Sequence, residues 1–335
     1  MSCKKDPIGY MAHFNTKNPI PKVKAAEFTQ PLLLTPSEDW KGYLSNSAGR
    51  IFLFAITFVS VIAVLLIFIF IIREATEFLT GNNLKEFFTS TGWYPTHNPP
   101  EFGILAIMAG TGYVTLVALL LAVPLGILAA VYLSDIAPFK LRQIVKPIIE
   151  ILAAIPSVAY GFFAVLVFSP WLEVNLDITK GTNALNAGII LALMALPTII
   201  SVAEDSLSAV GREIREAAYG LGSTRAETLI KVVIPEAHSG IIAAVILGMM
   251  RAIGETMVVL MAAGMSSQIP SPWWDLADGV RPMTATIAQE MGETPKGSLH
   301  YQALFAIGFF LLLFTFGLNM LSEHFLARVR KRKRG

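Results

Sequence analysis

The sequence has little charge and a single cysteine. Only 15% of its 335 residues are charged and 54% are hydrophobic, whereas soluble domains carry roughly 25% charged residues. We therefore expect a membrane protein. The one cysteine, Cys3, excludes an internal disulfide framework and any metal site built from several thiols. No apolar stretch precedes Cys3, so we expect the N-terminus to be retained rather than cleaved as a secretory signal.

The sequence also lacks the motifs of common catalytic sites. A Gly-Lys dipeptide does not occur, which excludes the G-x-x-x-x-G-K-[ST] loop that cradles nucleotide phosphates. The five histidines form no H-E-x-x-H pair, and the only thiol lies at the third residue. An enzyme would have neither a nucleophile nor a metal cluster to act with, so we expect a chain without catalysis of its own.

Long apolar segments are what the sequence has instead. Six of them are near or above the length of about 20 residues that a helix needs to cross a bilayer. They cover 51–72, 103–133, 147–169, 184–203, 240–263 and 303–321. The pattern predicts an all-α polytopic membrane protein with six transmembrane helices. Pro124, Pro156 and Pro197 are expected to kink or interrupt the second, third and fourth helices.

Lys and Arg are distributed unevenly between the connecting segments, and cytoplasmic segments carry the excess. With the N-terminus inside, 20 basic residues face the cytosol and five face outside. We therefore expect a plasma-membrane protein with both termini in the cytosol. The basic run at 328–334 is interpreted as an anchor for lipid headgroups rather than a nucleic-acid site.

Three regions follow from this layout. They are a cytoplasmic extension at 1–50, a transmembrane domain at 51–325 that includes a cytoplasmic loop at 204–238, and a basic cytoplasmic tail at 326–335. In the extension, the residues from Ser37 to Asp39 could cap a short helix that carries Trp40 and lies at the membrane interface. The alternative is a loop with incidental aromatic residues.

One charged pair lies inside the fifth apolar segment. Arg251 would be near the bilayer midplane if the run 240–264 formed one helix, and an ionisable group is costly there. Glu255 follows four residues later, on the same helical face and within pairing distance. The pair is interpreted either as a structural tie between helices or as part of a substrate path. The second reading is favoured because intramembrane ionisable residues mostly face the interior and mark such paths.

The loop at 204–238 is amphipathic and is predicted to be cytoplasmic. Helix formers mixed with Arg and Glu lead to Gly222, a good helix stop, and a second short helix at 224–231 is expected to end at Pro235. Two short helices joined at a glycine would form a docking element for a soluble partner; an ordinary solvated loop is the alternative. Glu204 and Asp205 are expected to end the fourth span in solvent.

This loop resembles the EAA loop of ABC importer permeases, whose pattern is EAA-x3-G-x9-I-x-L-P. The matching residues are Glu216, Ala217, Ala218, Gly222, Val232, Ile234 and Pro235. Valine for isoleucine and isoleucine for leucine keep the apolar character of the pattern. The spacing is specific because the whole motif lies between two predicted spans.

Two further segments are similar to the C-type permeases of phosphate importers, the PstC family. One runs from Arg251 through Glu255 and Thr256, and the other contains Glu150, Pro156, Ser157, Tyr160 and Gly161. The outer stretch 284–300 is similar to that family as well. The resemblance covers about residues 50–325.

The resemblance implies the type I fold of ABC importer permeases and a place in the bacterial inner membrane. The chain would form half of a phosphate pathway, lined by Arg251, Glu255, Thr256, Ser157 and Tyr160. The residues implied to couple it to ATPase movement are Glu216, Ala217, Ala218, Gly222 and Pro235. The implied partners are a homologous A-type permease, two ATPase subunits, an external phosphate-binding protein, phosphate and membrane lipids, without nucleic acid. No metal or cofactor is expected in this chain, since ATP and Mg would bind the ATPase subunits.

A guanidinium suits phosphate because its planar fork of donors matches phosphate geometry, whereas a lysine is only a point charge. Arg251 is therefore the expected phosphate contact. Glu255 would hold Arg251 when the path is empty and, when the anion arrives, either release Arg251 or repel the anion onward. Ser157 and Tyr160 fit a kinked packing helix equally well. Candidates for the outer mouth, or for docking a binding protein, are Gln289, Glu290 and Glu293.

Three other functions are open to a sequence of this kind. An importer for another oxyanion, molybdate or sulfate, would share the loop and differ in specificity. An ion-coupled secondary transporter would show inverted repeats with broken helices and no docking loop. A membrane enzyme acting on lipid phosphates would need a catalytic cluster that the sequence lacks.

Overall fold

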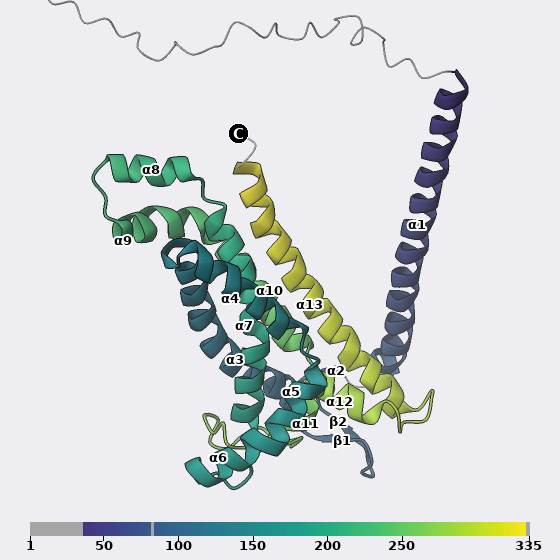
Figure 1. The fold of residues 1–335 in the computed structure, drawn as a ribbon. Helices are drawn as coiled ribbons and strands as arrows, with labels where there is room; N and C mark the ends of the chain where they lie inside the picture. Colours follow the sequence, from purple (N-terminus) through teal and green to yellow (C-terminus); the bar gives the residue numbers. More distant parts are fainter. Residues whose placement is uncertain (1–35, 82–83, 333–335) are drawn as a thin grey trace, which may run out of the picture. The chain divides into compact units, whose positions relative to one another are not determined.

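The computed structural model describes residues 36–81 and 84–332. The chain divides into two units, residues 1–66 and residues 67–335, and the second holds the packed bundle shown in Figure 1.

The described chain is mostly helical. Its helices are α1 (Pro36–Gly81), α2 (Leu84–Thr89), α3 (Leu105–Val131), α4 (Phe139–Ala154), α5 (Ser157–Phe163), α6 (Ser169–Leu176), α7 (Ala184–Ser208), α8 (Arg212–Gly220), α9 (Arg225–Thr228), α10 (Ile234–Gly254), α11 (Met257–Ala262), α12 (Met283–Glu290) and α13 (Leu299–Arg332). Three π-helical turns extend them: η2 (Tyr132–Ile136), η3 (Ala164–Phe168) and η4 (Leu229–Val233). Two short strands, β1 (Trp93–Tyr94) and β2 (Glu101–Phe102), pair antiparallel.

Six helical runs in the described chain are long and apolar enough to cross a membrane, which confirms the predicted count. They are Gly49–Gly81, Leu105–Ile136, Ser157–Leu176, Ala184–Ser208, Arg225–Gly254 and Leu299–Phe325. Pro124 and Pro197 lie inside helices that continue past them. The first, third and fifth runs differ in extent from their predicted segments.

Helix α1 begins well before the predicted first span. It runs unbroken from Pro36 to Gly81, so the separate interfacial helix expected from Ser37 onward is part of this same helix. Pro36 occupies the first helical position, where its missing N–H costs no hydrogen bond, and the next proline is Pro95. Residues 1–35, most of the predicted extension, lie outside the described residues.

The third predicted span is divided at Pro156. Helix α4 ends at Ala154, Ile155 is extended with ψ 127°, and α5, η3 and α6 together form the spanning run. A proline cannot donate a backbone hydrogen bond and disfavours the helical conformation of the residue before it. Pro147, by contrast, lies inside α4.

Helix α7 is the centre of the bundle and packs against α3 and α10 through small residues. Ile199 of α7 is fully buried between two glycines, Gly126 of α3 and Gly248 of α10. A Cβ on either glycine would lie within 2.7 Å of the Ile199 side chain. A similar contact joins Gly188 of α7 to Val117 of α3. Small residues allow helix backbones to approach closely, which is how membrane helices gain packing energy.

Beside the packing around α7, a separate apolar cluster joins the β1–β2 hairpin to five helices. These are the end of α1, α2, the start of α3, α12 and the first turns of α13. Its fully buried members include Phe78, Trp93, Ile107 and Leu304. In Figure 1, α6, α11, α12 and the hairpin gather at one end of the bundle, the hairpin end, whereas α8 and α9 lie side by side at the other, the loop end. The bundle therefore separates two groups of connecting segments.

Candidate functional site

The predicted fifth span is broken just after Arg251. Helix α10 ends at Gly254, Glu255 is extended with φ −71° and ψ 137°, and the short helix α11 begins at Met257. Arg251 therefore lies in the last turn of α10 and not in the middle of a long helix. The predicted pairing of Arg251 with Glu255 is not formed, although Glu255 directly follows the last helical residue and keeps a helical φ. No salt bridge joins these two side chains among the described residues.

Helix α12 stabilises this break from the side. The Thr284 hydroxyl donates a hydrogen bond of 2.6 Å to the carbonyl oxygen of Glu255. The neighbouring Met283 N–H donates 2.9 Å to the Thr111 hydroxyl of α3. Thr284 is buried, and its bond satisfies a carbonyl that the end of α10 leaves without a helical partner. The break is thus part of the packed structure.

Helices α5 and α11, which follow the breaks at Pro156 and Glu255, pack against one another. A Cβ on Gly161 would lie 2.6 Å from the Met261 sulfur, so a larger residue there would require the Met261 side chain to move. The Tyr160 hydroxyl donates 3.2 Å to the Leu152 carbonyl across the first break. Tyr160 is also close enough to Arg251 for the two side chains to interact electrostatically.

The predicted pathway residues are therefore brought together in part. Arg251 is exposed, and Ser157, Tyr160, Glu255 and Thr256 are half-buried. Within the described part of the chain, no hydrogen bond or salt bridge uses the Arg251 guanidinium, whose five donors are free for an anion. Irregular backbone at membrane depth is tolerated where it is buried in protein or lines a cavity.

The loop at 204–238, called the docking loop below after its predicted role, has the predicted pair of short helices joined at a glycine. Gly222 has φ +87°, a left-handed conformation that favours glycine, and the Ser223 N–H returns to the Ala218 carbonyl at 3.1 Å. Thr224 and Glu227 then form a capping box that starts α9. The chain therefore reverses direction through local hydrogen bonds alone.

The EAA residues lie on α8. Glu216 and Ala217 are exposed, whereas Ala218 is buried. Large apolar side chains are also exposed around the turn, namely Ile214, Tyr219, Leu221 and Ile230. Leu221 is 88% exposed, which is unfavourable in water unless a partner covers it. The loop thus has the mixed apolar and acidic surface of a docking element.

Pro235 does not end the second helix of the loop, contrary to our prediction. Helix α9, η4 and α10 form one helical run, Arg225–Gly254, that passes through Pro235. Pro235 lies at the start of α10, directly after the π-helical turn whose last residues bond five positions back. In a π-helical turn the backbone N–H groups bond five positions back and not four. This shift in the hydrogen-bond pattern accommodates Pro235, which has no N–H to donate. The docking loop is consequently continuous with the fifth span.

Arg215 joins α8 to the bundle. Its guanidinium pairs with Asp135 of η2 and donates to the carbonyls of Leu207 at 2.8 Å and Val210 at 3.3 Å. Burial lowers the pKa of Arg215 from its ordinary value, but an arginine keeps its charge at neutral pH. Sequence reasoning placed Arg215 in the loop without assigning it a contact.

Glu204 is buried, which the sequence did not predict. Its side chain is 3% exposed and pairs with Arg142 and with Lys146 of α4, the latter at 2.9 Å. Asp205 is exposed and receives a second bond from Lys146 at 3.1 Å. The expectation that both carboxylates end α7 in solvent is therefore wrong for Glu204, because two cations stabilise it inside.

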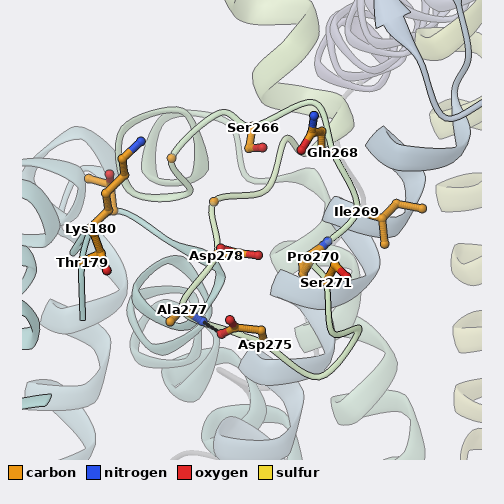
Figure 2. A pocket seen from close by; sticks show the side chains of 13 residues that line it. Thr179, Lys180, Ser266, Gln268, Ile269, Pro270, Ser271, Asp275, Ala277 and Asp278 are labelled. Carbon is orange, nitrogen blue, oxygen red and sulfur yellow. Dashed lines mark hydrogen bonds between the residues drawn. The ribbon is translucent and has the colours of Figure 1, made fainter. Parts of the chain in front are cut away.

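A polar cavity of about 540 Å³ opens at the hairpin end of the bundle, between the start of α7 and the loop at 264–279. Figure 2 shows Lys180 on one side and the loop with Asp275 and Asp278 curling around the other. Gly264 has φ +83°, and a Cβ there would lie 2.5 Å from the Thr182 carbonyl oxygen. The loop is therefore fixed against the segment that precedes α7.

Glu290 of the predicted outer set is a structural centre more than an exposed carboxylate. It accepts hydrogen bonds from the Trp93 indole at 3.0 Å, from His300 at 2.7 Å and from Arg281. Gln289 is exposed and accepts from Arg281 at 3.2 Å. Glu293 is exposed and lines a neighbouring cavity of about 450 Å³. Glu290 thus ties α12 to the hairpin and α13.

Six candidate spans, broken helices beside an unpaired arginine and an exposed docking loop define a polytopic membrane transport protein. The chain belongs to the family of binding-protein-dependent transport system inner membrane components, whose model matches residues 122–331. It is therefore a permease component of the ABC importer type.

The relatives are similar over most of their length. The chain is 34% identical over 287 residues to the probable ABC transporter permease protein YqgH of Bacillus subtilis, covering 85% of this chain and 92% of the relative. It is 35% identical over 265 residues to the phosphate transport system permease protein PstC of Mesorhizobium japonicum, covering 73% and 79%. A PstC of Pasteurella multocida is 30% identical over 292 residues, covering 80% and 90%.

A solved structure shows the same fold. A chain of the MetNI methionine ABC transporter, in an inward-facing conformation, matches with a TM-score of 0.52 and 16% identity. The match covers 68% of this chain and 95% of the other. The predicted fold of an ABC importer permease is thus confirmed.

Proposed function

We propose that this chain is a permease subunit of an ATP-driven phosphate importer and forms half of its translocation pathway. The observation that carries the proposal is one continuous helical run, Arg225–Gly254, with the docking loop at its start and Arg251 in its last turn. The relatives named phosphate transport system permease support phosphate as the solute. The run connects the place where an ATPase would act to the place where an anion would bind.

The proposed path passes Arg251 and the two helix breaks. The Arg251 guanidinium binds phosphate through its fork of donors, and Tyr160, Ser157 and Thr256 line the adjacent surface. No salt bridge joins Glu255 to Arg251 among the described residues. Of the predicted roles of Glu255 we therefore keep one: Glu255 repels the anion onward past the break and is not the resting counter-ion of Arg251.

The proposed partners follow from the two ends of the bundle. At the loop end, Glu216, Ala217, Ala218 and the glycine turn at Gly222 dock on an ATPase subunit that binds ATP and Mg, while this chain has no ATPase site. A homologous second permease completes the pathway. A phosphate-binding protein docks at the hairpin end, beside the cavity near Lys180. Both termini lie in the cytosol, and the chain itself holds no cofactor.

The test is ATP hydrolysis by the complex that copurifies with this chain, reconstituted in lipid. Binding proteins loaded with phosphate, molybdate or sulfate are added separately. We expect stimulation by the phosphate-loaded protein alone. Stimulation by a molybdate- or sulfate-loaded protein instead would assign the chain to another oxyanion. Transport driven by an ion gradient without ATP would make it a secondary transporter.

A further inference from the structure

The inward-facing side of the docking helix carries one strongly bonded residue, Arg215. Its side chain is 17% exposed and that of Asp135 is 13% exposed, so the ion pair is largely shielded from water. The second carboxylate oxygen of Asp135 is buried and has no other hydrogen-bond partner among the described residues. The buried negative charge of Asp135 is therefore compensated by the positive charge of Arg215.

Arg215 connects three elements that are distant in sequence. Asp135 belongs to η2, which continues α3, and lies 80 residues before Arg215. Leu207 and Val210 are at the C-terminal end of α7, where the last carbonyls of a helix lack partners and favour a cation. One guanidinium thus satisfies the end of α7 and the end of α3 at once.

The two helices that Arg215 reaches are the closely packed pair at the centre of the bundle. Gly188 of α7 meets Val117 of α3, and Ile199 of α7 is enclosed by glycines from α3 and α10. In the order of the sequence, α8 follows α7 and is connected through α9 to α10. Without Arg215, no side-chain ion pair would connect α8 to the α3 side among the described residues.

We propose that Arg215 and Asp135 form a positioning pair that makes the docking helix α8 move as one body with the inner ends of α3 and α7. A displacement of α8 then reaches the whole α3–α7–α10 core and does not act on α10 alone. The inference rests on the proposed function, since it concerns how ATPase movement reaches the pathway. Neither residue is proposed to contact the solute.

The first readout is a distance that does not depend on transport. In a Cys3→Ser background, spin labels are placed at the exposed positions Ile136 and Gly220, and the interlabel distance is measured in the assembled complex. We expect one narrow distribution with Asp135 present and a broad one in Asp135→Asn, whereas Asp135→Glu restores the narrow form. Equal distributions in the Asp135→Asn variant and its parent would overturn the proposal.

The second readout is the amount of phosphate moved per ATP hydrolysed. Asp135→Asn and Arg215→Gln should lower this ratio about fivefold, because α8 still docks but its movement is no longer transmitted. Arg73→Gln, which breaks the exposed Arg73–Glu77 pair, is the matched control and should keep the parental ratio. If phosphate transport and ATP hydrolysis both fall in proportion to the amount of complex, their ratio is unchanged. The pair would then be only structural, and the positioning role would be wrong. Failure of the proposed function would appear in the parent, which would then show no phosphate-dependent hydrolysis.

Discussion

At the scale of single residues, Arg251 is notable because it forms no salt bridge with any residue that the structure describes. An ionisable group inside a membrane protein usually has a partner or faces a path. Glu255 does not supply the partner, since no salt bridge joins its carboxylate to Arg251 in the described part of the chain. The exposed guanidinium therefore fits the anion-binding role that we propose for it better than the role of a structural tie.

Glu204 has the opposite character, a buried carboxylate with two cations. Glu204→Gln should lower the stability of the chain by about 2 kcal/mol, because one charge of a shielded network is removed and two cations remain. The measurement is the midpoint of thermal unfolding in detergent. Asp205→Asn is the control: its side chain is 66% exposed, and a surface pair contributes about 0–1 kcal/mol. Equal midpoints for both variants would contradict the buried role of Glu204.

At the scale of elements, the turn at Gly222 determines how α8 is presented. Gly222→Ala places a Cβ at φ +87°, a conformation that costs a non-glycine residue roughly 1–2 kcal/mol. We expect normal amounts of chain in the membrane but reduced stimulation of ATP hydrolysis by the loaded binding protein. Gly220→Ala, a neighbouring helical position with open space, should behave as the parent. Unchanged stimulation in Gly222→Ala would show that the turn does not set the docking geometry.

At the scale of the whole molecule, the close packing of α7 against α3 and α10 fixes the positions of these three helices relative to one another. The docking loop and the proposed pathway at Arg251 are both connected to this packed core. Gly248→Ala would place a Cβ 2.5 Å from Ile199, which Gly126 already confines on its other side. Such overpacking costs about 1–3 kcal/mol, so the thermal midpoint should fall. Gly112→Ala on α3 meets nothing within 4 Å and should leave the midpoint unchanged. A shift of equal size in both variants would argue against close packing at Ile199.

The six spans and the docking loop are predictable from the sequence. Each span is a long apolar run, and the loop carries a motif with specific spacing. The helix break at Glu255 is not predictable in this way, since it is stabilised by Thr284, 29 residues later. Likewise, Glu204 looks like a solvated helix end until Arg142 and Lys146, 62 and 58 residues away, are placed beside it. At Pro235 a local rule predicted a helix end, and a π-helical turn removed the conflict. The break at Glu255 and the burial of Glu204 depend on contacts between residues distant in the sequence, which a local sequence pattern does not show.

The central claim is that phosphate crosses the membrane by binding the Arg251 guanidinium. It is tested most directly by uptake of radiolabelled phosphate into vesicles that contain the assembled complex with Arg251, Arg251→Lys or Arg251→Gln. We expect Arg251→Gln to abolish uptake and Arg251→Lys to retain a part of it, because lysine keeps the charge but not the fork of donors. Arg73→Gln, remote from the helix break, should transport as the parent does. Undiminished uptake by Arg251→Gln would contradict the account.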